Sequence, residues 1–302
     1  MCEGVLAIGG SSWHGAQNTV EVLNTSSSTT TSTILTTFTN LPIGGLWGHV
    51  ALALPLSPQF LVCGGKGRHH NPLLLHTCLT YNYTTSAWTN HSTLVSARHY
   101  SAGLTLASGD SYLVGGAYSP TSTEVLPAGT STWLPGPALP RHAPLFKGCA
   151  APVNATHLVT VGGGWLYTMV TVLSTNSGTW STLPELAAGR RGHACAALGA
   201  RVVVAGGYLF THQQYTASTL LLDPSTGAAA PGPAMAIPRA YFALQQLPDR
   251  LLAIGGSTVW SYQRTVEVLA EGSGAWTAAN TSLAIGRSTF ATLACQALAP
   301  LP

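Results

Sequence analysis

Short apolar runs recur along the chain, and six of them end in a pair of glycines. The runs are Val5–Ile8, Phe60–Cys63, Tyr112–Val114, Leu158–Val161, Val202–Ala205 and Leu251–Ile254. Apolar runs this short, closed by glycine, are typical of buried β-strands rather than helices. The first glycines of the pairs are residues 9, 64, 115, 162, 206 and 255, which gives spacings of 55, 51, 47, 44 and 49. The pattern therefore predicts a repeat of about 50 residues.

Other positions recur in step with the glycine pairs. An alternating strand with a central glutamate occurs at residues 19–23, 122–126 and 265–269, and a tryptophan follows a short turn later at Trp88, Trp133, Trp180 and Trp276. A loop then ends in arginine at Arg98, Arg141, Arg190, Arg239 and Arg287, before a further apolar strand such as residues 193–198. Four strands in each of six repeats predict a propeller. We expect the tryptophans to wedge between blades and the glutamates Glu21, Glu124 and Glu267 to be packing residues.

The combination of glycine pair, glutamate strand, tryptophan and arginine resembles the kelch-repeat family over essentially the whole chain. The resemblance implies an all-β, six-bladed kelch-type β-propeller with four antiparallel strands per blade, as one domain over residues 1–302. Three positions depart from the pattern: Phe38 and Leu46 stand near the tryptophan and arginine positions of the first repeat, and Ala229 replaces the tryptophan of the fifth.

The two ends of the chain predict how the ring closes. The chain starts within a second strand, residues 4–10, and ends with an orphan first strand, residues 288–295, so pairing them would complete a blade. Aligning the repeats places Cys2 and Cys295 at one tight turn, which predicts a disulfide. Cys63 and Cys78 are expected to face each other across a hairpin, whereas the alignment leaves open whether Cys149 and Cys195 pair.

Composition narrows the class of protein. Apolar residues make up 46% and charged residues only 7%, while Ser and Thr number 26 and 37. The chain is thus too apolar for disorder, no apolar run is long enough to span a membrane, and a net charge of +3 is too small to indicate nucleic-acid binding.

Two features favour an extracellular protein. Six cysteines suit an oxidised framework, and five sequons are present, at Asn24, Asn82, Asn90, Asn154 and Asn280. Residues 5–8 are too short for the apolar part of a signal peptide, so we expect a secreted glycoprotein whose signal peptide is not in this chain. Asn24, Asn82 and Asn154 map to turns on one face, which would leave the opposite face bare.

The bare face carries the candidate binding residues. Loops on it contain Trp13, Trp47, Tyr118, Trp165, Tyr208 and Trp260. Aromatic side chains with a polar rim suit sugars, flat rings or peptides. The resemblance to kelch proteins that bind acidic peptides implies that Arg98, Arg141, Arg190, Arg239 and Arg287 reach an anionic ligand. The alternative is that these arginines only bond to loop carbonyls of neighbouring blades.

The main hypothesis is a binding module for a glycan, an anionic small molecule or a peptide, without a cofactor. An isomerase- or mutarotase-like enzyme using Glu185, Arg190 and Arg191, or an oxidase-like one, is the first alternative. A metal at His69, His70 and His76 is a weaker candidate, since closely spaced loop histidines are usually solvated. A kelch adaptor for other proteins is the second alternative.

Overall fold

The computed structural model describes residues 4–25, 38–55, 57–67, 76–163 and 165–295. These residues form β-strands joined by turns and loops, and no α-helix occurs among them. In this part of the chain no helix is long and apolar enough to cross a membrane. The predicted all-β class is confirmed.

Six antiparallel sheets contain most of the strands, and their order follows the sequence. Sheet 1 has three strands among the described residues: β30 (Ala291–Ala294), β1 (Val5–Ile8) and β4 (Val20–Leu23). Sheet 2 contains β6 (Val50–Leu54), β7 (Gln59–Cys63), β9 (Cys78–Asn82) and β10 (Ala87–Asn90). Sheet 3 contains β11 (Ala102–Thr105), β12 (Ser111–Val114), β13 (Thr123–Leu126) and β14 (Leu134–Pro135).

The later half of the chain repeats this arrangement. Sheet 4 contains β15 (Cys149–Asn154), β16 (His157–Gly163), β17 (Met169–Ser174) and β18 (Thr179–Leu183). Sheet 5 contains β20 (Ala194–Leu198), β21 (Arg201–Ala205), β24 (Thr219–Leu222) and β25 (Ala229–Gly232). Sheet 6 contains β26 (Ala243–Leu247), β27 (Arg250–Ile254), β28 (Thr265–Ala270) and β29 (Thr277–Ser282).

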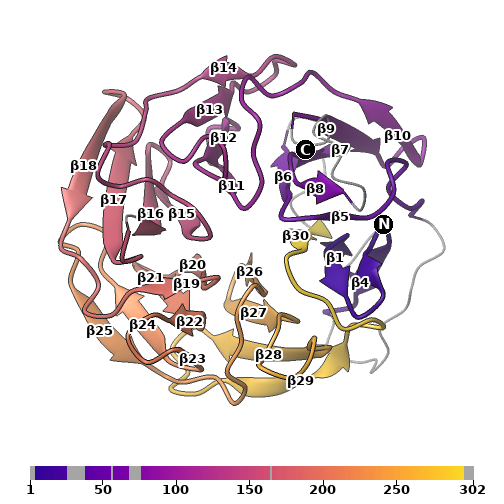
Figure 1. The fold of residues 1–302 in the computed structure, drawn as a ribbon. Coiled ribbons are helices and arrows are strands. Elements are labelled where there is room, and N and C mark those ends of the chain that lie inside the picture. The colour runs from indigo at the N-terminus through magenta and orange to yellow at the C-terminus, as the bar shows by residue number, and fades with distance from the viewer. Residues whose placement is uncertain (1–3, 26–37, 56, 68–75, 164, 296–302) are drawn as a thin grey trace.

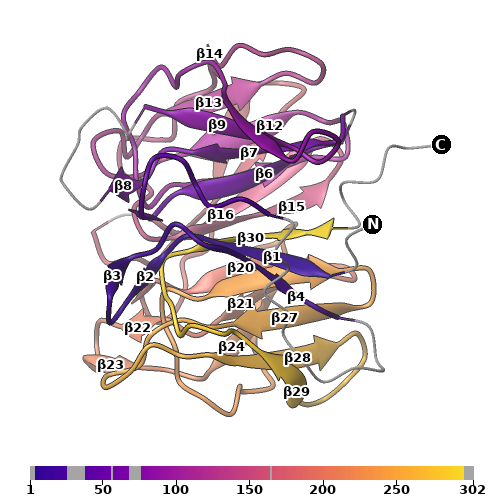
Figure 2. The same cartoon turned by 90° about the vertical axis from the view of Figure 1, so that its right-hand side faces the viewer.

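Three small sheets gather on one side of the molecule, called the loop face below (Figure 2). They pair β5 (Leu46–Trp47) with β8 (Lys66–Gly67), β2 (Ser11–Ser12) with β3 (Gly15–Ala16), and β19 (Arg190–Arg191) with β22 (Tyr208–Leu209) and β23 (Gln214–Tyr215). The loops after the glycine pairs and the loops that enter the first strands therefore meet on this face.

The six large sheets surround a common centre, with their first strands innermost (Figure 1). Contacts between these inner strands run in a cycle from β30 to β6, β11, β15, β20, β26 and back to β30. The two ends of the chain meet in sheet 1, where Val5 pairs with Ala294 and Ile8 with Ala291. Ser11 and Ser288 extend this contact, and the amide of Cys295 donates to the carbonyl of Gly4. The predicted pairing of residues 4–10 with residues 288–295 is confirmed.

The core lies between neighbouring sheets. Each of the six apolar clusters joins two sheets; Val159 of sheet 4, for example, packs with Val204 of sheet 5. Trp133 of sheet 3 is buried among residues of sheet 2, and the indole N–H of Trp276 donates to the carbonyl of Pro233 at 3.0 Å. These two tryptophans do wedge between sheets, as the repeat pattern predicted, and each such ring buries roughly 150–250 Å².

The glycine pairs end their strands because a side chain would not fit there. Gly64 has a φ of 67°, and a Cβ on it would lie 2.7 Å from the carbonyl oxygen of Arg98. The amide of Gly65 donates to that same carbonyl at 3.0 Å. The pair thus lets the backbone of one sheet approach the loop entering the next sheet.

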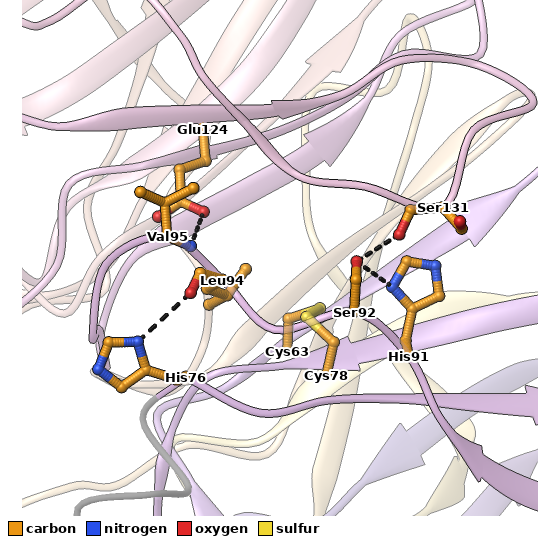
Figure 3. The surroundings of a disulfide bond; sticks show 9 residues. All are labelled: Cys63, His76, Cys78, His91, Ser92, Leu94, Val95, Glu124 and Ser131. Carbon is orange, nitrogen blue, oxygen red and sulfur yellow. Dashed lines mark hydrogen bonds between the residues drawn. A yellow bond between two sulfur atoms is a disulfide. The ribbon is translucent and has the colours of Figure 1, made fainter.

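Two disulfides join pairs of residues that the structure describes, and both reinforce the sheets. Cys63 and Cys78 join adjacent strands of sheet 2 with a Cα separation of 4.2 Å, as predicted (Figure 3). Cys149 and Cys195, whose pairing the sequence left open, join β15 to β20 and so link sheets 4 and 5 across 5.7 Å. Cys2 lies outside the described residues, so the Cys2–Cys295 bridge stays a prediction.

Candidate ligand-binding site

A closed circle of backbone hydrogen bonds surrounds the centre of the loop face. Its members are Gly48, Tyr100, Lys147, Gly192, Tyr241 and Thr289, here called the collar, and all have φ between 55° and 66°. Each amide donates to the carbonyl of the preceding member at 2.6–3.3 Å, and the amide of Gly48 donates to Thr289 to complete the circle. Four members are not glycine, and this left-handed backbone costs such residues about 1–3 kcal/mol each. The collar is therefore a strained structure that the surrounding sheets hold in place.

The collar frames a cavity of about 140 Å³. Its walls are the six collar residues and the residues that follow them, namely His49, Ser101, Gly148, His193, Phe242 and Phe290. Every large sheet contributes through the loop entering its first strand. Because strained backbone and concave surface coincide here, the cavity is the leading candidate for a binding site.

Aromatic rings hold two cations, Lys147 in the cavity wall and Arg191, which directly precedes the lining residue Gly192. The Lys147 Nζ lies 4.9 Å from the ring centroid of Tyr100, 5.0 Å from that of Phe146 and 5.6 Å from that of Tyr241. The guanidinium of Arg191 lies 5.0 Å from the ring centroid of Tyr208. Such cation–π contacts favour the charged forms of both side chains by about 0.5–2 kcal/mol each.

Burial and charge shift the pKa values around the cavity. Burial, and then the charge of Arg191, lowers the pKa of Lys147. Burial together with Lys66 and Lys147 lowers the pKa of His99 to about 4, so His99 is neutral at physiological pH. Burial raises the pKa of Tyr100 and of Tyr241, so both phenols keep their protons. The cavity rim thus combines cations with neutral hydrogen-bond donors.

The predicted aromatic residues divide into exposed and packed groups. Trp13, Tyr118, Trp165 and Trp260 are 71%, 70%, 92% and 84% exposed, whereas Trp47 and Tyr208 are half-buried. Trp13 packs edge-on against Tyr262, and Trp47 against His99. These four aromatic side chains are therefore presented to solvent by loops that follow the glycine pairs.

Three of the predicted arginines are not ligand-binding side chains. Arg98, Arg239 and Arg287 are fully buried. They form ion pairs with Glu124 at 2.5 Å, Glu267 at 2.7 Å and Glu21, respectively. The expectation that these three reach an anionic ligand does not fit the structure, because the repeated glutamate neutralises the buried arginine of its own sheet.

The glutamate also organises the loop that leads to the arginine. Glu124 accepts the amide hydrogen of Val95 at 2.8 Å (Figure 3). It also accepts the amide hydrogen of Ser96 at 2.9 Å. Glu267 accepts those of Ala236 and Ile237, and Glu21 accepts that of Ala284. These glutamates were expected to be packing residues, and the structure shows that each forms a buried, charged clamp between strand and loop.

Arg141 and Arg190 differ from the other three. The amide of Gly116 donates to Leu145, just as that of Gly65 donates to Arg98, so Leu145 and not Arg141 occupies the repeat position. Arg141 is exposed in a longer loop, so its assignment to the arginine position of the repeat is wrong. Arg190 does occupy the repeat position, but it is buried and bonds to the carbonyls of Gly206 and Ser218. For Arg190 the alternative reading, a bond to loop carbonyls, describes the structure.

The candidates for catalysis and metal binding were Glu185, Arg190, Arg191 and three loop histidines. Glu185 is exposed and accepts a hydrogen bond from the Thr168 hydroxyl. In the described residues no ion pair joins Glu185 to Arg190 or Arg191. His69 and His70 lie outside the described part of the chain, and His76 Nδ1 lies 3.4 Å from the carbonyl oxygen of Leu94. Within that part no cluster of His, Cys, Asp and Glu is suited to a metal.

The predicted glycosylation sites lie at strand ends or on outer strands. Asn82 ends β9, Asn154 ends β15, and Asn24 follows β4. Asn90 ends β10 and Asn280 lies within β29, both exposed. The side-chain oxygen of Asn154 accepts hydrogen bonds from the amide and hydroxyl of Thr156, its sequon partner. Modification of these residues stays a prediction.

Sequence reasoning missed the collar residues Tyr100, Lys147 and Tyr241. The available signal was their position two residues after Arg98, Leu145 and Arg239, where the other repeats have Gly48, Gly192 and Thr289. The residue types differ so widely that only the backbone reveals the shared role. In comparisons with known proteins, no family model matches the chain and no curated protein matches it either.

Proposed function

We propose that the chain is a secreted, six-bladed propeller of kelch type that binds a glycan, an anionic small molecule or a peptide on its loop face. The main support is that the loop face combines exposed aromatic side chains with a cavity whose wall contains the cation Lys147. The exposed side chains are Trp13, Tyr118, Trp165 and Trp260. Exposed aromatic rings stack on sugar and peptide surfaces, and a polar cavity at their centre orients the ligand.

Three observations support the six-bladed arrangement. Inner strands touch in a cycle, the collar closes through six backbone hydrogen bonds, and each apolar cluster joins two neighbouring sheets. Glycine pairs, inter-sheet tryptophans and arginine–glutamate pairs repeat along the chain in the kelch order. These features favour the kelch relationship that the sequence pattern suggested.

Two observations support secretion. Two disulfides join described residues, and such bonds persist mainly in oxidising compartments. Asn82, Asn90, Asn154 and Asn280 are accessible in the structure. Expression in a glycosylating cell, followed by intact-mass measurement before and after glycosidase treatment, tests this part of the proposal. A mass unaltered by the enzyme counts against it.

Binding is tested on a panel of neutral, sulfated and carboxylated glycans together with acidic peptides. Trp165→Ala and Trp260→Ala are expected to weaken the binding of the best panel member by about tenfold each, since stacking on a ring contributes about 1–2 kcal/mol. The control is Leu134→Ala, which removes an exposed apolar side chain from the outer strand β14. Equal effects of all three variants would contradict the proposed face.

A further inference from the structure

Lys147 and Arg191 form a pair of cations without a counter-ion. They are close enough for the charge of Arg191 to lower the pKa of Lys147. Among the described residues no ion pair reaches either side chain. The buried arginines Arg98 and Arg239, by contrast, each have a glutamate. Two like charges held together without a carboxylate favour binding of an anion.

The hydrogen-bond donors of this pair are also without acceptors. The Nε of Arg191 is buried, and no described residue accepts its hydrogen. Aromatic faces hold both cations, on Tyr100 and Tyr241 for Lys147 and on Tyr208 and Phe210 for Arg191. A ring face attracts the charge but leaves N–H groups available for a ligand. These N–H groups can therefore donate charge-assisted hydrogen bonds to an acceptor from outside the chain.

The surroundings fix where that acceptor binds. Lys147, Gly192 and Tyr241 line the central cavity, and Arg191 precedes Gly192 directly. The ring centroid of Tyr241 lies 5.6 Å from the Lys147 Nζ. Burial raises the pKa of the Tyr241 phenol, and the positive charge of Arg191 opposes that rise. The protonated hydroxyl of Tyr241 is a further hydrogen-bond donor among the residues that line the cavity. Glu185, the carboxylate of the enzyme alternative, accepts a hydrogen bond from Thr168 instead.

We infer that Lys147 and Arg191 bind the oxyanion, a carboxylate or a sulfate, of the ligand at the edge of the central cavity. This inference rests on the proposed binding function and narrows it to acidic ligands. The exposed tryptophans would contact the rest of the ligand, while the oxyanion anchors it at the centre. Guanidinium and ammonium groups together suit an oxyanion because they supply several convergent charge-assisted hydrogen bonds.

The test uses sodium acetate and sodium sulfate as probes, titrated at constant ionic strength while the NMR signals of the protein are followed. We expect saturable shifts in the wild type, and about a tenfold or greater loss of affinity in Lys147→Gln and Arg191→Gln. The stronger of the two probes identifies the type of oxyanion. Arg141→Gln removes the same charge from an exposed loop position and is expected to change affinity less than twofold.

Absence of saturable shifts with both probes in the wild type overturns the inference, as does equal binding by Lys147→Gln and the wild type. These failures differ from failure of the proposed function. If Trp165→Ala and Trp260→Ala weaken glycan or peptide binding while Lys147→Gln does not, the face binds ligands but not through this anion site. If only the lysine and arginine variants matter, the anion site stands without the tryptophans.

Discussion

Arg98 and Arg190 occupy the same position in sheets 3 and 5, yet their surroundings differ. Each donates one N–H to the carbonyl of the first glycine after the second strand, Gly115 at 2.9 Å or Gly206 at 3.1 Å. Beyond that shared contact, Arg98 meets the carboxylate of Glu124, whereas Leu220 stands at the equivalent register of sheet 5.

The presence or absence of the glutamate changes the pKa of the buried arginine. Burial lowers the pKa of Arg190 to about 10, with no carboxylate to oppose it. Burial also lowers the pKa of Arg98, but Glu124 counters part of that effect. Sheet 5 therefore tolerates a buried guanidinium satisfied only by neutral oxygens. The hydrogen bonds from Arg190 to Gly206 and Ser218 offset the free-energy cost of burying this charge.

The remaining sheets extend the comparison. Sheets 1 and 6 have both partners, Arg287 with Glu21 and Arg239 with Glu267. Sheets 2 and 4 have neither: Leu46 and Leu145 take the arginine position, and Leu79 and Thr171 take the glutamate register. The two charges thus occur together or not at all, except in sheet 5. The residue found at this repeat position therefore depends on whether its sheet has a glutamate to pair with an arginine, and not on contact with a ligand.

The largest expected effect comes from giving sheet 3 the composition of sheet 5. Glu124→Leu leaves Arg98 buried without its carboxylate and frees the amides of Val95 and Ser96. We expect the free energy of unfolding at neutral pH to fall by about 3–5 kcal/mol. Urea denaturation measures the change, with the exposed Glu185→Gln as the control. A loss no larger than that of the control would show that sheet 3 tolerates a lone arginine as sheet 5 does.

The second prediction converts sheet 3 to the composition of sheet 2. The double variant Arg98→Leu/Glu124→Leu removes both charges, as Leu46 and Leu79 do naturally in sheet 2. It is expected to recover about 2–3 kcal/mol of the stability lost by Glu124→Leu alone, because no uncompensated buried charge remains. A double-mutant cycle in urea measures the coupling. Additive losses would mean that packing and not charge accounts for the pair.

These comparisons also show how far the sequence could lead. The glycine pairs, the strand order, the closure of residues 4–10 on 288–295 and the Cys63–Cys78 bridge follow from repeats that are visible in the residue pattern. The misplacement of Arg141 arose because the loop from Leu139 to Leu145 is two residues longer than that from Leu94 to Arg98. The positions of the arginines along the sequence do not by themselves reveal these two extra residues.

The candidate site was harder to predict than the fold. Collar positions hold glycine, tyrosine, lysine and threonine, so no residue type marks them, and the left-handed backbone is imposed by the closed circle of hydrogen bonds. The pairing of arginine with glutamate did leave a signal. Repeats that lack the arginine also lack the glutamate, but reading this requires the strand register that only the structure supplies.

The third prediction concerns acid stability, because the loop of sheet 5 also carries His193 where sheet 3 has Ser101. Burial, and then the charge of Arg190, lowers the pKa of His193 from 6.5 to about 3. Below about pH 6.5 the unfolded chain binds a proton that folded His193 does not take up until about pH 3, so stability falls as the pH falls through this window.

One such histidine contributes about 1.4 kcal/mol per pH unit, or roughly 2 kcal/mol between pH 6.5 and pH 5. His193→Gln should lose that part of the slope in urea denaturation measured across the window, relative to the wild type. The exposed His142→Gln is the control and should keep the wild-type slope. A His193→Gln slope equal to that of the wild type would show that His193 takes up its proton within the folded protein.

The smallest expected effect comes from supplying sheet 5 with the partner it lacks. Leu220 is half-buried at the register that holds Glu124 in sheet 3, so Leu220→Glu places a carboxylate beside Arg190. The burial of Arg190 is already part of the folded state, and only the new carboxylate must lose water. We expect Leu220→Glu to be more stable than the uncharged, equally long Leu220→Gln by about 1 kcal/mol at neutral pH. Paired urea denaturation curves measure the difference, and the comparison with glutamine cancels the loss of the leucine side chain. If the glutamate variant is the less stable of the two, desolvation of the carboxylate outweighs its attraction to Arg190, and a lone arginine is the better solution for this sheet.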